Sequence, residues 1–333
     1  MGDSLKNIAT RLGLSKTTIS WVLSGQGQKR GIKAETQELV RKCAAEMNYQ
    51  PNLLAKSLRD GSSKTIGLIV PSINDSFYSG IAEEIEKEAL RQGYSLMIGS
   101  SDSEIEQENA MIRLFTAKMV DGIIIAPTKI SKREISSLAA RKFPLVQFDR
   151  YFPELEIDHV IIDNEQASYA LTKALAGKGC RNIAIITTNP HLLTMDLRRE
   201  GYANALADAG LKVNQALYGE VPYFGYRENI VGVLDRIFET VPEVDGFFFT
   251  THILAIEALR YFRRNGIDPT CVDMACMHHD QLFRLIAPEM AIAEFPVEEI
   301  SRRCVKLLME RINAEPAANL PSRGEVVPCR IDL

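Results

Sequence analysis

The first residues with a recognisable chemical use are polar side chains on one short helical segment. The segment follows Ser15, a residue type that often caps helices, and its apolar residues fall at helical spacing on the opposite face. The side chains expected to point outward are Lys16, Thr17, Ser20 and Trp21. Side chains near the start of such a helix can reach base edges in the DNA major groove. They fit the exposed face of an ordinary helical hairpin equally well.

Catalytic and phosphate-binding sequence patterns are missing from the chain. It contains no P-loop, no GxGxxG that opens a helix, no HExxH and no GxSxG. Cys276, His278, His279 and Asp280 lie close together in the sequence. Adjacent residues at a strand end point in opposite directions, so we do not expect all of them to bind one metal ion. The sequence therefore predicts neither an enzyme nor a metal site, and it indicates no cofactor.

Two short helices joined by a tight turn would position the outward side chains. The stretch LKNIATRLGLSKTTISWVLSG, residues 5–25, has apolar residues at helical spacing on both sides of Gly13. Glycine readily takes the positive φ that ends a helix. Residues 34–48 continue with apolar spacing that predicts a third helix. These three helices form a helix-turn-helix unit, which presents its second helix to DNA.

The formal charge is divided unequally along the chain. Residues 1–64 contain eleven lysines and arginines against five acids, a charge of +6, and the remaining residues contain 28 against 38, a charge of −10. A basic head on an acidic body suits a nucleic-acid-binding module joined to a second function. The loop GQGQKRGI, residues 25–32, is expected to be mainly a flexible connector whose basic residues could touch phosphate.

From residue 64 the pattern changes to alternating strands and helices. Residues 49–52 break the third helix, 53–59 could form one short helix, and 60–63 form a linker. The expected strands are 65–70, 95–99, 120–126, 145–148, 160–162, 183–187, 217–220, 246–250 and 272–277, with helices between them. Two runs of such units predict an α/β body of two doubly wound lobes. Ligands bind at the carboxyl ends of such strands, where the loops converge.

Composition indicates a soluble protein of the reducing cytoplasm. The chain is 46% hydrophobic and 25% charged, which is ordinary for a globular protein, and it contains no run of eighteen apolar residues. No apolar signal-peptide core begins it. Its six cysteines contain no CxxC pair, as expected for free thiols.

These segments together resemble the LacI/GalR family of bacterial transcription regulators. The resemblance rests on the hairpin, on YQPNLLAKSL, and on TIGLIVPSINDSFYSGI, VDGIIIAP, VQFDR, VIIDN, RREGYANALADAGL and FPVEEIS in that order. It implies a homodimer that binds a palindromic operator, and a body like the periplasmic sugar-binding proteins that closes on a small, sugar-like effector. It also implies a repressor. The C-terminus has no leucine heptads for a tetramer, so a dimer is expected.

The resemblance assigns DNA contacts to the head and to the hinge helix. They are Lys6, Ser15, Lys16, Thr17, Thr18, Ser20, Trp21, Lys29, Arg30, Asn52, Ala55, Leu58 and Arg59. Trp21 stands where the family usually has an arginine, and an indole offers only one N–H and a stacking face. Leu58 matches the leucine that the family inserts into the minor groove, although it could equally be a dimer contact.

The resemblance assigns effector contacts to loops between the lobes. They are Asp75, Phe77, Asp149, Arg198, Tyr223, Phe224, His252 and His278. Arg198 matches an arginine that binds effector hydroxyls or a carboxylate. The two aspartates could instead cap a helix or a turn, and the three aromatic residues could be core. His252 and His278 stand where the family often has aspartate, which argues against a plain neutral hexose.

The resemblance also sets the expected domain boundaries. These are 1–50 for the helix-turn-helix domain, 51–64 for the hinge helix and linker, and 65–333 for the effector-binding and dimerisation domain. Lobe 1 is expected at about 65–163 and 294–323, and lobe 2 at about 164–293 and 324–333. A solute-binding protein for transport would share this body fold, and a sugar-converting enzyme could be built from the same βα units. The basic head argues against the first, and the missing catalytic motifs argue against the second.

Overall fold

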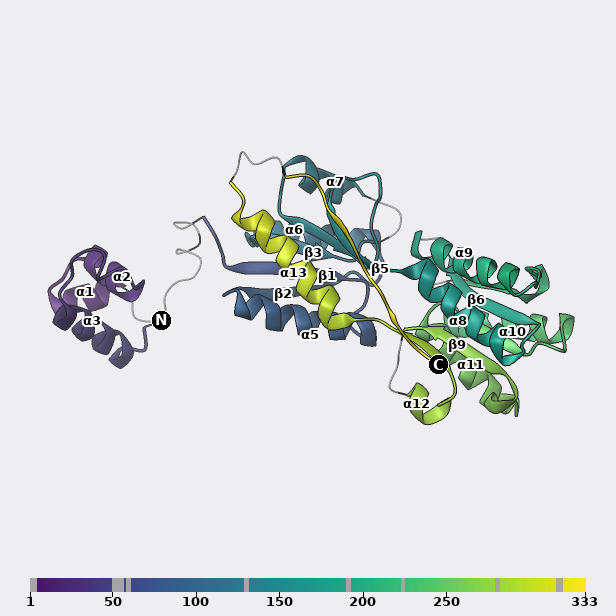
Figure 1. Ribbon diagram of the computed structural model, residues 1–333. Coiled ribbons are helices and arrows are strands. Elements are labelled where there is room, and N and C mark those ends of the chain that lie inside the picture. The colour runs from purple at the N-terminus through teal and green to yellow at the C-terminus, as the bar shows by residue number, and fades with distance from the viewer. Residues whose placement is uncertain are drawn as a thin grey trace. The chain divides into compact units, whose positions relative to one another are not determined.

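The chain forms two compact units, residues 1–63 and 64–333 (Figure 1). The computed structural model describes residues 5–49, 57, 61–128, 132–189, 193–222, 225–278, 282–315 and 320–333. Within these ranges no helix is both long enough and apolar enough to cross a membrane. The hinge residues predicted at 51–56 and 58–59 lie outside the described part of the chain.

The first unit contains the three predicted helices. They are α1 (Leu5–Leu12), α2 (Lys16–Leu23) and α3 (Ala34–Glu46). Ile8, Ile19 and Val40 are fully buried between them, which closes a small apolar core. Ser15 caps α2 because its hydroxyl accepts a hydrogen bond from the Thr18 N–H at 3.0 Å. The prediction of a three-helix unit is confirmed.

The loop between α2 and α3 is folded into turns, and the prediction of a flexible connector was wrong. Its backbone closes with hydrogen bonds from Arg30 N to Gln26 O at 3.1 Å and from Ile32 N to Gly27 O at 2.9 Å. The side chain of Gln37, on α3, donates to Ile32 O at 2.7 Å. Composition suggested flexibility because glycine and polar residues are common in linkers, but two of these hydrogen bonds close turns within the loop and the third comes from Gln37, outside it.

The second unit is an α/β body of two lobes. The first lobe has a parallel sheet in the order β11-β5-β4-β3-β1-β2. Its strands are β1 (Thr65–Val70), β2 (Ser95–Ser100), β3 (Gly122–Ile125), β4 (Leu145–Phe148), β5 (Asp158–Ile162) and β11 (Gly324–Val327). Its helices are α5 (Ser76–Arg91), α6 (Ile105–Ala117), α7 (Arg133–Ala140) and α13 (Val297–Asn313). Helices α5 and α13 pack together on one face, and α6 and α7 cover the other.

The second lobe repeats the arrangement with the order β12-β10-β9-β8-β6-β7. Its strands are β6 (Ile183–Asn189), β7 (Tyr218–Pro222), β8 (Gly246–Phe249), β9 (Asp273–Met277), β10 (Ala291–Glu294) and β12 (Arg330–Asp332), and β12 alone among these six runs antiparallel to its neighbour. Its helices are α8 (Asn164–Lys178), α9 (Leu193–Asp208), α10 (Tyr226–Thr240), α11 (His252–Arg264) and α12 (Phe283–Ile286), with 3-10 turns at Gln215–Leu217 and Pro269–Cys271. The predicted fold class, two doubly wound lobes behind a helix-turn-helix unit, is confirmed.

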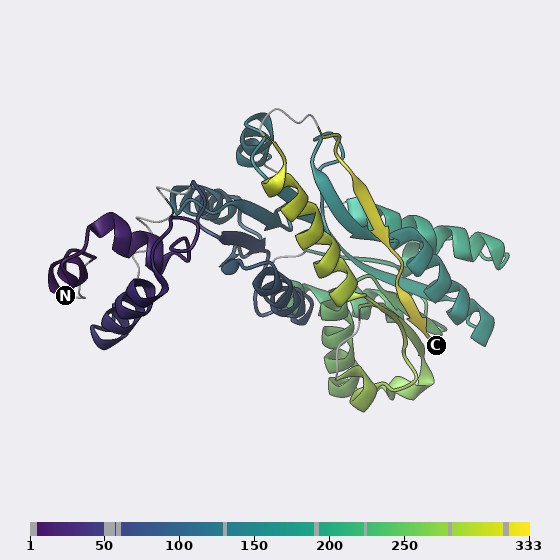
Figure 2. The same ribbon diagram turned by 60° about the vertical axis from the view of Figure 1, so that its left-hand side comes forward.

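The chain passes between the lobes at three places. The first passage lies between β5 and α8, and the second between β10 and α13. The third was predicted near Arg323 but lies between β11 and β12, at residues 328–329. Residues 324–327 pair with β5 as the outer strand of the first lobe, with Glu325 opposite Val160, and so they cannot belong to the second lobe. Figure 2 shows this yellow segment running from one lobe to the other.

Helices α8 and α9 approach each other closely because Gly201 lies at their contact. A Cβ atom on Gly201 would come within 2.2 Å of Glu165 O and 2.8 Å of Tyr169 N, both backbone atoms of α8. Backbone cannot move aside as a flexible side chain can. Gly201 therefore fixes the distance between the helix that follows the first passage and the helix that carries Arg198.

We expect Gly201→Ala to destabilise the body by about 3 kcal/mol, because the added methyl forces α8 and α9 apart. Gly232, in α10, is a matched control, since nothing lies within 4 Å of its Cβ position. Gly232→Ala should leave stability equal or raise it by about 0.5–1 kcal/mol through helix propensity. Thermal unfolding followed by circular dichroism measures both. Equal unfolding temperatures for the two variants would contradict the close helix contact.

Candidate functional site

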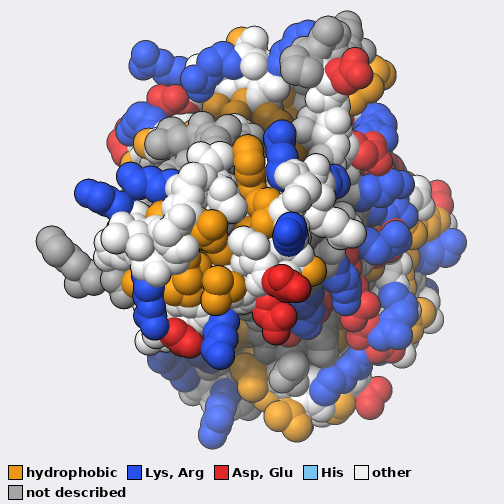
Figure 3. All heavy atoms as spheres, turned by 90° about the vertical axis from the view of Figure 1, so that its left-hand side faces the viewer, with side chains coloured by type: hydrophobic (Ala, Val, Ile, Leu, Met, Phe, Trp, Pro, Cys, Tyr) orange, Lys and Arg blue, Asp and Glu red, His pale blue; other side chains and the backbone are white. Residues whose placement is uncertain are grey.

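The outward face of α2 carries the side chains predicted to read DNA. Lys16 and Thr17 are exposed, and Ser20 and Trp21 are half-buried. Lys6, Lys29 and Arg30 are also exposed, and blue Lys and Arg side chains are spread over the face drawn in Figure 3. Ser15 and Thr18 have structural partners, since their hydroxyls lie 2.8 Å apart and Ser15 caps the helix. Asn52, Ala55, Leu58 and Arg59 lie outside the described residues.

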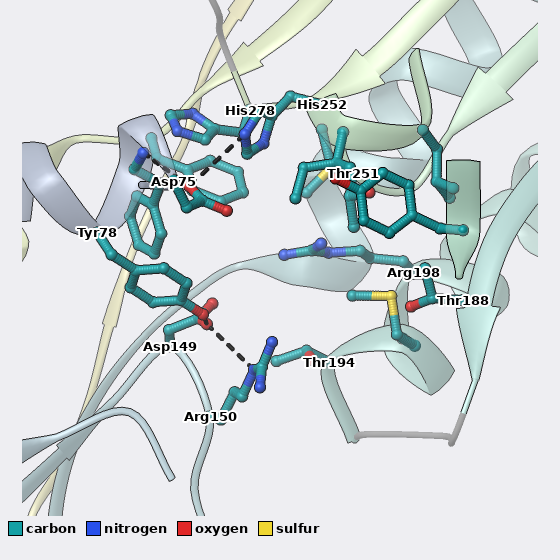
Figure 4. A pocket seen from close by; sticks show the side chains of 17 residues that line it. Asp75, Tyr78, Asp149, Arg150, Thr188, Thr194, Arg198, Thr251, His252 and His278 are labelled. Carbon is teal, nitrogen blue, oxygen red and sulfur yellow. Dashed lines mark hydrogen bonds and ion pairs between the residues drawn. The ribbon is translucent and has the colours of Figure 1, made fainter. Parts of the chain in front are cut away.

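A pocket lies between the two lobes, where the loops after the parallel strands meet (Figure 4). Its cavity measures about 70 Å³. Six of the predicted effector contacts line it: Asp75, Phe77, Asp149, Arg198, His252 and His278. The other two, Tyr223 and Phe224, lie outside the described part of the chain. The loops from both sheets thus bring together residues that are as much as two hundred positions apart in sequence.

Arg198 is the buried cation of the pocket. Only 4% of its surface is exposed, so it is not the surface arginine that a helix start could equally carry. Its Nε donates to Asn164 Oδ1 at 2.8 Å, and its Nη1 donates to Thr250 O at 2.7 Å. The guanidinium lies 5.6 Å from the ring centre of Phe295. Burial lowers the pKa of Arg198, and the nearby Asp149 acts in the opposite direction. The fold holds this guanidinium with neutral oxygens and directs it into the pocket (Figure 4).

Asp149 faces Arg198 from the first lobe. The hydroxyl of Tyr78 donates to Asp149 Oδ2 at 2.7 Å, and Arg150 Nε lies 3.6 Å from the same oxygen. Asp149 has a positive φ of 58°, an unusual backbone conformation that aspartate tolerates better than most residues. Burial raises the pKa of Tyr78 far above its ordinary value, so the phenol stays a hydrogen-bond donor. A carboxylate held in this way can accept hydrogen bonds from ligand hydroxyls.

Asp75 joins the two lobes through His252. It caps α5, since its Oδ1 accepts from Phe77 N at 2.9 Å, and the same oxygen lies 3.6 Å from His252 Nε2. Burial raises the pKa of Asp75, while His252 acts to lower it. Both side chains are about nine-tenths buried. The capping role and the place in the pocket, which the sequence left as alternatives, are both present.

One wall of the pocket is aromatic. The His278 ring stacks on Phe295, with centres 4.8 Å apart and planes 12° apart. It meets Phe77 edge-on at 5.1 Å and His252 edge-on at 4.8 Å. Phe77 also packs against Tyr78 at 4.9 Å. Stacked aromatic rings of this kind provide a flat surface for the apolar face of a ligand ring.

Several lining residues had not been predicted from the sequence. Tyr78 follows the predicted Phe77, Arg150 follows Asp149 in the VQFDR segment, and Phe295 begins the FPVEEIS segment. Their positions beside predicted contacts and at the second passage could have singled them out. The remaining additions are Thr188, Thr194, Met195, Tyr226, Thr251, Ile253, Leu254 and Met277. Strand and helix patterns alone do not say which residue at a strand end faces the other lobe.

Family models match almost the whole chain. A model described as bacterial regulatory proteins, lacI family, matches residues 4–52. One described as periplasmic binding proteins and sugar binding domain of LacI family matches residues 63–245, and one described as periplasmic binding protein-like domain matches residues 172–331.

Similar proteins and structures extend over most of the chain. The ribose operon repressor of Haemophilus influenzae is 27% identical over 311 residues, 93% of this chain and 92% of that protein. The HTH-type transcriptional repressor PurR of Pasteurella multocida is 29% identical over 97% of both chains. The structure of the transcriptional regulator CelR in complex with cellobiose has a TM-score of 0.72 at 23% identity and covers 99% of this chain and 98% of that chain. The Cra transcriptional dual regulator from Pseudomonas putida, in complex with fructose 1-phosphate, also has a TM-score of 0.72, at 21% identity, and covers 81% and 98%.

Glu108, on α6, is a buried acid that the sequence pattern had not marked. It is fully buried, and its Oε2 accepts a hydrogen bond from Thr128 N. Its Oε1 is buried and has no hydrogen-bond partner among the described residues. Burial raises the pKa of Glu108 to about 7, while Thr128 and Arg150 act to lower it. An acid with this pKa changes its charge near neutral pH.

The raised pKa predicts that this chain loses stability as the pH rises through 7. The folded chain keeps the Glu108 proton up to about pH 7, whereas an unfolded chain releases it near 4.5. The contribution of protonated Glu108 to the free energy of unfolding is therefore complete below about pH 4.5, decreases as the pH rises towards 7, and is lost above pH 7. Glu108→Gln should remove this dependence and raise stability at pH 8 by up to about 3 kcal/mol.

Denaturant unfolding between pH 5 and 8 measures the effect. Glu106→Gln is the matched control, because it removes one carboxylate from the exposed face of the same helix. A Glu108→Gln variant that is destabilised equally at every pH would show instead that the carboxylate is required for packing.

Proposed function

Because the chain belongs to the LacI family of bacterial regulatory proteins, we propose that this DNA-binding transcription regulator is a repressor controlled by a small effector. In this proposal a homodimer binds a palindromic operator through the helix-turn-helix units, and the effector is a sugar or sugar derivative. The observation that carries it is the presence, in one chain, of a helix-turn-helix unit and a pocket lined by both lobes. Binding to DNA implies that it acts in the cytoplasm.

The lining of the pocket supports a polar ring as the effector. Asp75 and Asp149 can accept hydroxyl hydrogens, and Arg198 can donate to a ring oxygen, a hydroxyl or an acidic group. The aromatic wall at His278 and Phe295 suits the apolar face of a sugar ring. The structures of the similar regulators CelR, in complex with cellobiose, and Cra, in complex with fructose 1-phosphate, support the same class of ligand.

The position of the pocket supports control through lobe closure. Asp75, Tyr78 and Asp149 come from the first lobe, and Arg198 and His252 come from the second. A ligand that contacts both sets binds the closed arrangement more tightly than the open one and so shifts the population towards it. Strand β1 of the first lobe begins directly after the linker at residues 61–64. Closure of the two lobes would therefore change the distance between the two linkers of a dimer.

A cytoplasmic solute-binding protein is the second candidate, and only the same body fold supports it. It would bind the same class of ligand but would need no DNA-binding unit. A mobility-shift assay on genomic fragments, with and without candidate sugars, separates the two. Sequence-specific binding that responds to a sugar supports the regulator, and absence of any specific binding favours the second candidate.

We expect the DNA affinity to reside in residues 1–63 and to fall steeply with salt, because basic residues that neutralise phosphates release counterions. Operator binding of the intact chain should fall by about a thousandfold or more between 50 and 200 mM salt if six or more phosphates are contacted. A truncation that begins at Lys64 should not bind. Retention of binding by the truncation would place the DNA site in the body.

We expect Arg198→Ala to lower effector affinity about tenfold to a hundredfold, because a hydrogen bond to a charged group contributes about 1.5–3 kcal/mol. Calorimetry with ribose, cellobiose and fructose 1-phosphate first identifies which of these binds. Arg199→Ala is the matched control, since Arg199 bonds Asp196 and Tyr218 and does not line the pocket. Equal losses in both variants would indicate a general effect on α9 and would contradict a direct contact.

A further inference from the structure

Arg30 lies over the ring of Trp21, and this pairing joins a loop to the second helix of the helix-turn-helix. The guanidinium carbon of Arg30 is 5.0 Å from the Trp21 ring centre. Trp21 is four residues after Thr17, so the two side chains share one face of α2. Thr17 is exposed on the face that a helix-turn-helix presents to DNA. The guanidinium is thereby held about one helical turn from the outward polar side chains of α2.

The loop that carries Arg30 is held in place by the fold. Gln26 N donates to Trp21 O at 2.8 Å at the start of the loop, and Arg30 N donates to Gln26 O. The side chain of Gln37 packs against Gly27, where a Cβ atom would lie 2.7 Å from Gln37 Cδ. These contacts fix the backbone on both sides of Arg30. The position of its side chain over Trp21 therefore follows from the loop structure together with the attraction between a cation and an aromatic face.

The N–H donors of the Arg30 guanidinium are available to bind another molecule. Over the described ranges, the side chain of Arg30 donates no hydrogen bond and forms no ion pair. Five N–H groups of a guanidinium remain on an exposed side chain. An indole ring offers a single N–H, which cannot bind two acceptors side by side. Guanine presents two such acceptors, O6 and N7, in the major groove, and arginine is the side chain that most often binds both.

We propose that Trp21 and Arg30 act as one base-reading unit, in which the indole ring orients the Arg30 guanidinium towards a guanine in each operator half-site. This inference rests on the proposed operator binding. It assigns sequence specificity to a loop residue, and it gives Trp21 the role of a positioning residue. Lys29, the exposed neighbour in the same loop, would contribute charge to phosphate without reading a base.

Selection from randomised DNA by the full-length chain gives the operator and its preferred bases. Arg30→Lys keeps the charge but loses the paired donors, so we expect operator affinity to fall about tenfold or more while binding to unrelated DNA stays the same. Selection with Arg30→Ala should lose the preference for guanine at one position of each half-site. Lys29→Gln is the control, and it should weaken operator and unrelated DNA alike.

A double-mutant cycle tests the link to Trp21. Trp21→Ala and Arg30→Ala should have effects that do not add, because either change releases the same contact. Trp21→Phe keeps an aromatic face without the N–H, and it should preserve the guanine preference. Additive effects, or a Trp21→Phe variant as impaired as Trp21→Ala, would overturn the positioning role. Thermal unfolding of each variant, with the wild-type midpoint expected, excludes loss of the fold.

The outcomes separate this inference from the proposed function. If the wild-type chain selects no DNA sequence, the proposed function fails and the inference fails with it. If the wild-type chain selects an operator and Arg30→Lys binds it with unchanged affinity and base preference, the inference alone fails. In that case Arg30 contacts phosphate or solvent.

Discussion

The body of this protein depends on how Arg198 is satisfied at the junction of its lobes. A buried guanidinium is costly unless its donors find acceptors. Here Asn164, the first residue after the first passage, accepts from Nε, and Phe295, at the second passage, lies beneath the guanidinium. The third passage is tied to the first by the hydrogen bond from Cys329 N to Asp163 Oδ1 at 2.8 Å. The three passages can surround one cation only when both lobes are folded.

This constraint explains why the pocket is formed there. Neutral oxygens hold the Arg198 guanidinium and do not cancel its charge, so its positive field extends into the space between the lobes. Asp149 and Asp75 face that space from the first lobe. Asp149 and Asp75 each have a cationic or hydrogen-bonding partner of their own. Of these two contacts, the one between Asp75 and His252 joins the lobes, whereas Asp149 and Arg150 both follow β4 of the first lobe. Any movement between the lobes must bend the three passages, and Arg198 contacts residues at the first two of them.

The sequence predicts β1 to β9, several of them from continuous apolar or β-branched runs, and misses β10, β11 and β12. β10 is buried, but it is only four residues long. β1 and β4 begin and end as predicted, because each is buried on both faces. β11 and β12 are short and half-exposed, and their partners lie as much as 165 residues away, so no local pattern marks them. Glu108 was missed for a related reason. An acid on an amphipathic helix is expected to face solvent, whereas Glu108 is buried and accepts a hydrogen bond from Thr128, twenty residues away in the chain.

The two histidines of the pocket also separate what local sequence predicts from what depends on tertiary contacts. The family resemblance places His252 and His278 where acidic residues are often found, and it predicts a pocket that accepts a different ligand from a plain neutral hexose. Only the structure separates their surroundings. His252 lies against a carboxylate, so a ligand that approaches it meets a polar pair. His278 is enclosed by Phe77 and Phe295 and forms part of the aromatic wall. The effector that we propose would present a polar edge towards Asp75 and an apolar face towards His278, because a sugar ring distributes its polar and apolar surface in this way.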